Sequence, residues 1–294
     1  HEDQSRSVFR FIQGHGPIRG FLGEIAMHLL ETSIIMAGSV LIGTTACSGV
    51  KAANAVPSYR LTIVFNNISY AGNLQTGWGF ACLIEGFQQT ILFDTGSDGN
   101  ILLSNMKVLG IDPGTVSAVV LSHIHADHCG GLERFLLRNP EVTAYLPESF
   151  PASFRQAIQD YGARVKTVGK PAQLFAQVHS TGEMGEWIKE QSLILETPKG
   201  LVIITGCAHP GIVHIAQKAK DLLKKDIYMV VGGLHLAGTS TTQIREIIRK
   251  LKALGVEKVA PSHCTGEEAI SLFKESWGKD FVEGGCGAVI LNSL

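Results

Sequence analysis

Residues 118–131 read AVVLSHIHADHCGG, and this stretch decides the fold class. Its first five residues are apolar or small, as expected for a strand that is buried on both faces of a sheet. Three histidines and an aspartate follow within six positions: His123, His125, Asp127 and His128. Imidazole nitrogens and carboxylate oxygens are ligands of zinc, manganese and iron(II). The stretch therefore predicts a metal site at the end of a buried strand, and two glycines let the chain turn sharply beneath it.

The four side chains cannot all reach one ion from a regular helix or strand. In a loop, His123 and His125 can hold one ion while Asp127 and His128 face a second. A solvated polar loop is the alternative, but so dense a cluster favours metal binding. We expect two divalent metal ions, with zinc as the first choice and manganese or iron as alternatives. Two cations lower the pKa of a shared water, and Asp127 is placed to orient or deprotonate that water.

Apolar segments and amphipathic segments alternate on both sides of this stretch. Strands are expected at residues 59–65, 80–85 and 90–93 before it, and at residues 201–205, 227–231 and 256–260 after it. Helices are expected at residues 212–223, 241–254 and 267–273, where apolar residues recur with the helical period. No long linker or repeat interrupts residues 59–294. The pattern predicts one α/β domain with sheets inside and helices outside.

Charge and composition narrow the choice of partner. The 294-residue chain has a formal net charge of -1 and contains no long run of lysine or arginine. Nucleic-acid binding normally needs a basic surface, so a small-molecule substrate is the better hypothesis. The six cysteines are dispersed with no CxxC pair, which argues against a disulfide-stabilised scaffold. The sequence does not predict an oligomeric state.

Residues 1–55 are predicted to be an N-terminal extension, and residues 56–294 to be the catalytic domain. Residues 34–46 are apolar or small, and Ala53-Asn-Ala55 resembles a signal-peptidase cleavage pattern. We therefore expect a signal peptide that begins at Met27, and an exported or periplasmic protein. A helix packed on the domain of a cytoplasmic protein is the alternative. The apolar run is too short for a stable membrane span.

The motif at residues 123–128 resembles the signature of the metallo-β-lactamase superfamily, and the resemblance extends from about residue 59 to the C-terminus. It implies an αββα sandwich, in which two mixed sheets pack face to face with helices outside. It also implies that Asp94, at the end of an earlier strand, accepts a hydrogen bond from a ligand histidine and fixes the tautomer of that histidine. His263, at the end of the last predicted strand, corresponds to the final metal ligand of the family.

The ligands between the motif and His263 match the family less closely. The family has a further histidine after the motif, but the corresponding turn here contains Thr181-Gly-Glu-Met184. His209, in the loop after the strand at 201–205, is the predicted replacement, and His179 is the fallback. Cys207 occupies the position of the bridging ligand by topology. The sequence leaves open whether Cys207 binds metal or packs beneath it.

Three further strings narrow the resemblance: GCAHPGI at residues 206–212, GGLHL at 232–236 and SHCTG at 262–266. They are similar to the branch named for 7,8-dihydropterin-6-methyl-4-(β-D-ribofuranosyl)aminobenzene 5'-phosphate synthase, which implies a phosphorylated or pterin-like ligand. His235 is predicted to contact substrate or transfer a proton, and a core histidine is the alternative. The free amides at Thr265 and Gly266 could hold a phosphate oxygen, and helix capping by Thr265 is the alternative.

The sequence thus favours a metal-dependent hydrolase, in which a water activated by two metals attacks a small, phosphorylated, ester-type substrate. A dihydropterin-methyl transferase (synthase) of pterin cofactor biosynthesis is the first alternative. A non-catalytic, metal-dependent binding or sensor protein that keeps the fold is the second, and a redox diiron enzyme is the third.

Overall fold

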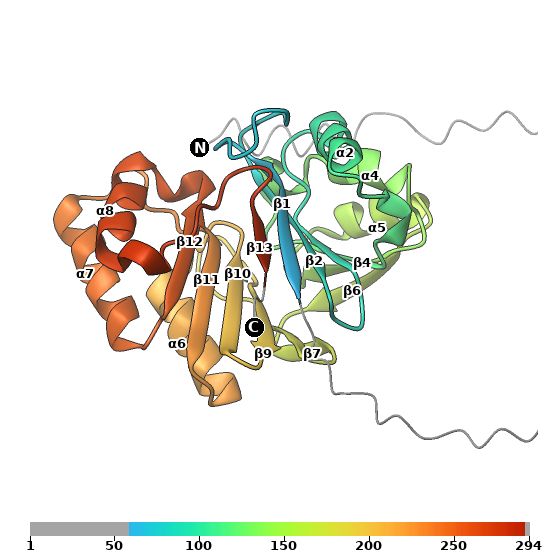
Figure 1. Cartoon of the computed structure of the whole chain (residues 1–294). Coiled ribbons are helices and arrows are strands. Elements are labelled where there is room, and N and C mark those ends of the chain that lie inside the picture. The colour runs from blue at the N-terminus through green and yellow to red at the C-terminus, as the bar shows by residue number, and fades with distance from the viewer. Residues whose placement is uncertain (1–58, 292–294) are drawn as a thin grey trace, which may run out of the picture. The chain divides into compact units, whose positions relative to one another are not determined.

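The computed structural model describes residues 59–291 (Figure 1). The whole of the predicted extension, residues 1–55, lies outside the described residues. The signal peptide, the domain boundary after residue 55 and export therefore stay predictions. Between residues 59 and 291, no helix is both long and apolar enough to cross a membrane.

A mixed seven-stranded sheet forms the N-terminal half of the described chain, in the order β13-β1-β2-β3-β4-β5-β6. Its strands are β1 (Arg60–Asn66), β2 (Phe80–Glu85), β3 (Ile91–Phe93), β4 (Ala118–Val120), β5 (Thr143–Pro147), β6 (Arg164–Val168) and β13 (Val289–Leu291). The strands from β13 to β3 pair antiparallel, and those from β3 to β6 pair parallel. The C-terminal strand β13 closes one edge of this sheet.

The second sheet has six strands in the order β12-β11-β10-β9-β8-β7. Its strands are β7 (Ala172–Phe175), β8 (Val178–Ser180), β9 (Leu193–Thr197), β10 (Gly200–Thr205), β11 (Ile227–Gly233) and β12 (Lys258–Ser262). The last three strands pair parallel, and β7 to β10 pair antiparallel. This sheet is therefore mixed as well.

The core lies between the two sheets and continues beneath the helices. One apolar cluster joins alternate residues of both sheets, among them Ile63 and Phe93 from the first and Ile204 and Val231 from the second. Such alternation is expected when two sheets pack face to face. The remaining strand residues face outward against helices in two further clusters. The predicted sandwich of two mixed sheets with helices outside is confirmed.

Each outer face of the sandwich carries its own helices, as Figure 1 shows. The first sheet packs on α2 (Gly99–Val108), α4 (Leu132–Leu136) and α5 (Ala152–Asp160). The second sheet packs on α6 (Ile212–Leu223), α7 (Thr241–Ala253) and α8 (Glu267–Trp277). In α7, Ile244, Ile248 and Leu251 are buried, at the spacing that places them on one helical face.

Most predicted strand boundaries shift by one or two residues, the predicted helix end at 273 is too early, and one predicted loop is wrong. The strand expected at 256–260 lies two residues later, at β12, and the helix expected at 267–273 continues to Trp277. Trp277 stacks on Phe273 with ring centroids 5.3 Å apart, and its Nε1 donates to the carbonyl of Val256. These contacts extend the helix and draw Val256 into the cluster beneath the helices. The motif is also not entirely a loop, since α3 (Ala126–Cys129) forms one helical turn.

Candidate metal centre

The predicted ligands lie at the carboxyl ends of strands from both sheets. His123 and His125 follow β4, Cys207 and His209 follow β10, and His263 follows β12. In the part of the chain that the structure describes, their ligand atoms form groups in which all members lie within 4.8 Å of one another. The first group contains His123, His125 and His209, and the second contains Asp127, His128, Cys207 and His263.

Three imidazoles meet in the first group. The Nε2 atom of His123 lies 3.1 Å from Nδ1 of His125, and the ring of His209 lies with its centroid 4.6 Å from that of His123. Burial lowers the pKa of His123 and of His125, and neighbouring histidines lower both further. Both rings are therefore neutral near pH 7, which is the state that binds a cation.

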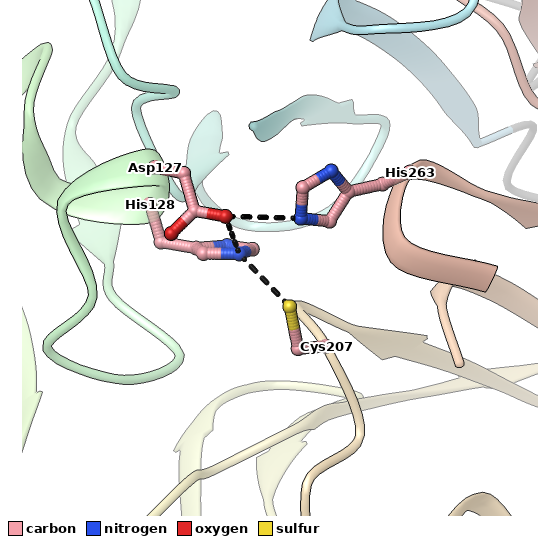
Figure 2. A group of neighbouring side chains, drawn as sticks. All are labelled: Asp127, His128, Cys207 and His263. Carbon is pink, nitrogen blue, oxygen red and sulfur yellow. Dashed lines mark hydrogen bonds and ion pairs between the residues drawn. The ribbon is translucent and has the colours of Figure 1, made fainter. Parts of the chain in front are cut away.

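The second group combines nitrogen, oxygen and sulfur donors (Figure 2). The Nε2 atom of His128 lies 3.2 Å from Sγ of Cys207 and 3.5 Å from Oδ2 of Asp127. The same carboxylate oxygen lies 3.2 Å from Nε2 of His263, yet that nitrogen is buried without a hydrogen-bond partner. Buried polar atoms normally have partners. A cation would supply one, so the residues present fit a metal ion.

Four of the histidines are oriented by a hydrogen bond at Nδ1, the ring nitrogen that points away from the centre. Nδ1 lies 2.8 Å from the Ser122 hydroxyl in His123, 2.7 Å from Asp94 in His128, 2.8 Å from Glu190 in His209 and 2.9 Å from the Asn67 side-chain oxygen in His263. A partner of this kind fixes the tautomer and the ring orientation of a ligand histidine. In these four rings Nε2 is left to face the centre.

Asp94 lies where the resemblance implies, beneath His128. Its carboxylate is fully buried and accepts hydrogen bonds from the backbone N–H and the hydroxyl of Ser122, both at 2.7 Å. Burial would lower the pKa of His128, but the carboxylates of Asp94, Asp127 and Glu190 outweigh it and raise the pKa to about 9. Metal binding at His128 must therefore release a proton, which couples occupancy to pH.

Replacing Asp94 by asparagine is expected to lower the metal affinity of the second group on the order of tenfold, because the amide NH₂ would face a donor. The backbone of Asp94 has φ 58°, which asparagine tolerates well, so the variant adds no backbone strain. Competition with a chromophoric chelator measures the affinity. Asp98→Asn is the control, since Asp98 caps α2 and asparagine caps a helix equally well. If the second group binds metal with the same affinity in both variants, the role of Asp94 is contradicted.

Glu190 is not among the residues predicted from the sequence. Its carboxylate is 1% exposed and accepts the backbone N–H groups of Cys207, Ala208 and His209 at 2.8–3.0 Å, and it also bonds the His209 ring. Burial would raise the pKa of Glu190, but His123 and His209 hold it well below its usual range. Glu190 thus shapes the whole turn that carries Cys207 and His209. An acidic residue three positions before the apolar strand β9 (Leu193–Thr197) is the weak signal that points to it.

Trp78 is the second residue that was not predicted. Its ring is 51% exposed and lies with its centroid 4.9 Å from that of His263. An exposed tryptophan between two glycines is a weak signal in a sequence. It gives the second group an aromatic wall that faces solvent.

The two candidates for the missing histidine lie in different places. His209 belongs to the first group, whereas Nε2 of His179 binds Glu196 at 2.6 Å on the second sheet. Among residues 59–291, His179 belongs to none of the groups that could hold a metal. Cys207 faces the second group, so its sulfur is directed at the centre. The metal-ligand roles of these residues stay predictions.

The residues predicted to contact substrate differ in accessibility. His235 is exposed, and its ring centroid lies 4.5 Å from that of His209, so it is not a core histidine. Thr265 is fully buried, and its hydroxyl donates to the carbonyl of Ser262 and accepts from the N–H of Leu234. Gly266, and not Thr265, is the N-cap of α8, so capping by Thr265 is wrong. Phosphate binding at Thr265 and Gly266 stays a prediction.

Comparisons with known proteins agree with this geometry. The family model described as the metallo-β-lactamase superfamily matches residues 79–263. A protein of Methanocaldococcus jannaschii named 7,8-dihydropterin-6-methyl-4-(β-D-ribofuranosyl)-aminobenzene-5'-phosphate synthase is 31% identical over 273 residues, covering 75% of this chain and 93% of that protein. An uncharacterised protein of the same organism is 30% identical over 244 residues, covering 72% of this chain and 92% of that protein.

Solved structures show the same fold. The crystal structure of Tm1679, described as a metal-dependent hydrolase of the β-lactamase superfamily, has a TM-score of 0.70 at 27% identity. It covers 79% of this chain and 98% of that one. YhfI from Bacillus subtilis, a metallo-β-lactamase fold protein, has a TM-score of 0.59 at 13% identity and covers 80% of this chain and all of that one.

Proposed function

Because this chain belongs to the metallo-β-lactamase superfamily, we propose that it is a metal-dependent hydrolase of a small, phosphorylated, ester-type substrate. One observation carries the proposal. Four histidines are each held at Nδ1 by a partner, so that their Nε2 atoms turn toward two adjoining groups of ligand atoms. The description of the similar Tm1679 structure as a metal-dependent hydrolase supports the same reaction class.

The first group would hold one divalent cation, and the second group would hold another. Zinc suits the second group best, because Cys207 adds a thiolate donor to histidine and carboxylate, whereas manganese prefers oxygen ligands. When bound, two such cations lower the pKa of a water molecule and polarise the oxygen of an ester.

Asp127 is the proposed general base. Burial would raise the pKa of Asp127, but His263 and His128 outweigh it and hold the pKa well below its usual range. The carboxylate is therefore ionised near pH 7 and can orient and accept a proton from an attacking water. Its side chain is partly accessible from solvent, unlike that of His128.

His235 is the proposed general acid. Its hydrogen bond with Cys264 raises the pKa of His235 above the usual value, although burial lowers it. The higher pKa favours the protonated ring. The exposed ring stands next to His209 and can donate a proton to a departing oxygen. His123 and His128 are fully buried, whereas Asp127 is partly accessible and His235 is exposed, so water would reach the centre past the latter two side chains.

Metal removal tests the hydrolase. Elemental analysis of the purified protein is expected to give two divalent ions per chain, one for the first group of ligand atoms and one for the second. Treatment with a chelator should abolish hydrolysis of p-nitrophenyl phosphate and its diester, and added zinc should restore it. Hydrolysis that survives complete metal removal would contradict the proposal.

A transferase of the synthase type is the second candidate. It is favoured by the 31% identity to the synthase of M. jannaschii, of which 93% is covered. In this reaction a carbon–nitrogen or carbon–carbon bond to the acceptor replaces attack by water, and diphosphate departs. Consumption of a labelled dihydropterin diphosphate without hydrolysis of any phosphate ester would establish it. Tight binding of two metals with no turnover in either assay would instead indicate a binding or sensor protein.

A further inference from the structure

A pocket of about 380 Å³ opens beside His209 and His235, between the start of α6 and the turn that follows β11. Aliphatic side chains make up much of its lining, which we call the floor, among them Ile212, Leu234, Leu236 and Ile247. His214 and Lys250 stand at the rim, and both are exposed. A volume of this size is in the range that accommodates a small organic group.

The pocket and the metal centre share a wall. His209 belongs to the first group of ligand atoms and His235 to a third group with Cys207, and the rings of the two histidines lie 4.5 Å apart. A substrate whose reacting bond lies against the centre would therefore extend the next part of its structure into the pocket.

The walls select an aromatic ring. The aliphatic floor offers no hydrogen bond, so a polar sugar or peptide would lose its partners there. The rings of His209, His235 and His214 offer flat, polarised surfaces at the rim, which suit the edge or the face of another ring. An aromatic group of one or two rings can pack on the aliphatic residues and contact the imidazole rings at the same time.

The rim also carries the ammonium group of Lys250, whose ion-pair partner Glu246 does not line the pocket. None of the described residues that line the pocket is acidic. Glu246 lies close to Lys250, but Arg249 binds this carboxylate at 2.7 and 2.8 Å, whereas Lys250 is 3.5 Å away. The charge of Glu246 is thus largely neutralised by Arg249, and the ammonium group of Lys250 can pair with a ligand.

We propose that this pocket binds the part of the substrate next to the reacting bond, and that this part is an aromatic ring with an anionic substituent directed at Lys250. The proposal rests on the proposed function only in placing the reacting bond at the metal centre. The pocket itself can be tested without any turnover.

Binding of phosphonates to the zinc-loaded protein tests the pocket by calorimetry, since a carbon–phosphorus bond is not hydrolysed. We expect 4-phosphonobenzoate to bind about threefold to fivefold more tightly than phenylphosphonate, the effect of one exposed ion pair. It should also bind more tightly than 5-phosphonopentanoate, which carries the same charges on an aliphatic chain. Lys250→Gln should abolish the difference between the two aromatic ligands and leave phenylphosphonate binding unchanged.

Lys218→Gln is the matched control, because Lys218 lies on α6 but does not line the pocket. Equal effects of the two lysine variants, or tighter binding of the aliphatic ligand, would overturn the proposal. With 4-carboxyphenyl phosphate as substrate, Lys250→Gln should raise KM by about the same factor, and Lys218→Gln should not. Ring-selective binding without hydrolysis would defeat the hydrolase alone, whereas hydrolysis without ring selectivity would defeat the pocket alone.

Discussion

Replacing His209 by alanine is expected to lower the affinity for one of the two metals by about a hundredfold or more and to abolish turnover. Loss of a residue that merely holds a ligand histidine already costs about tenfold to a hundredfold, so loss of the ligand itself should cost at least as much. The first group would retain only His123 and His125, and two nitrogen ligands do not complete a protein metal site. Elemental analysis after dialysis and a chelator competition measure the loss.

His179→Ala is the matched control for this experiment. His179 is the other histidine that the sequence offered for the same role, and it bonds Glu196 on the second sheet. The variant should keep both metals and nearly all turnover, and should lose at most the small stability of a partly exposed ion pair. If the two variants show the reverse order, the assignment of His209 to the first group is wrong.

Most of the metal centre can be predicted from the sequence because most of the candidate ligands form a recognisable local pattern at the end of an apolar strand. His123, His125, Asp127 and His128 are contiguous and follow an apolar strand, and His263 also stands at a strand end. Parallel strands bring their carboxyl ends to one edge of a sheet, and the two sheets of this fold face each other. The proximity of residues from distant segments can therefore be inferred from the strand topology alone.

The remaining parts depend on contacts that no local pattern encodes. Glu190 lies in residues 182–192, which show neither helical nor strand periodicity, and only the folded chain brings it beneath the turn at 206–209. Trp78 meets His263 through a loop between β1 and β2 whose course the sequence does not reveal. The later start of β12 has a similar cause. The carbonyl of Val256 accepts a hydrogen bond from Trp277, which lies on a helix further along the chain.

Glu190→Gln is expected to weaken both metal groups at once, by about tenfold to a hundredfold each. The carboxylate of Glu190 accepts from three consecutive backbone N–H groups and bonds the His209 ring. Glutamine keeps the size of the side chain but replaces one acceptor oxygen with an NH₂ donor, so at least one donor in this buried turn loses its partner. Because Cys207 and His209 leave the same turn toward different groups, a disturbed turn misplaces one ligand of each.

Cobalt substitution separates this prediction from a general loss of stability. The cobalt-loaded protein should show a thiolate charge-transfer band from Cys207 in the second group, and Glu190→Gln should weaken this band along with the affinity of the first group. Asp94 bonds His128 directly but reaches His123 only through the Ser122 hydroxyl, so Asp94→Asn should lower the affinity of the second group more than that of the first. Glu196→Gln controls for removal of a carboxylate, since Glu196 pairs with His179 and Lys225 away from both groups. A Glu190→Gln protein that loses only the first metal, with an unchanged cobalt–thiolate band, would show that Glu190 supports His209 and not the turn as a whole.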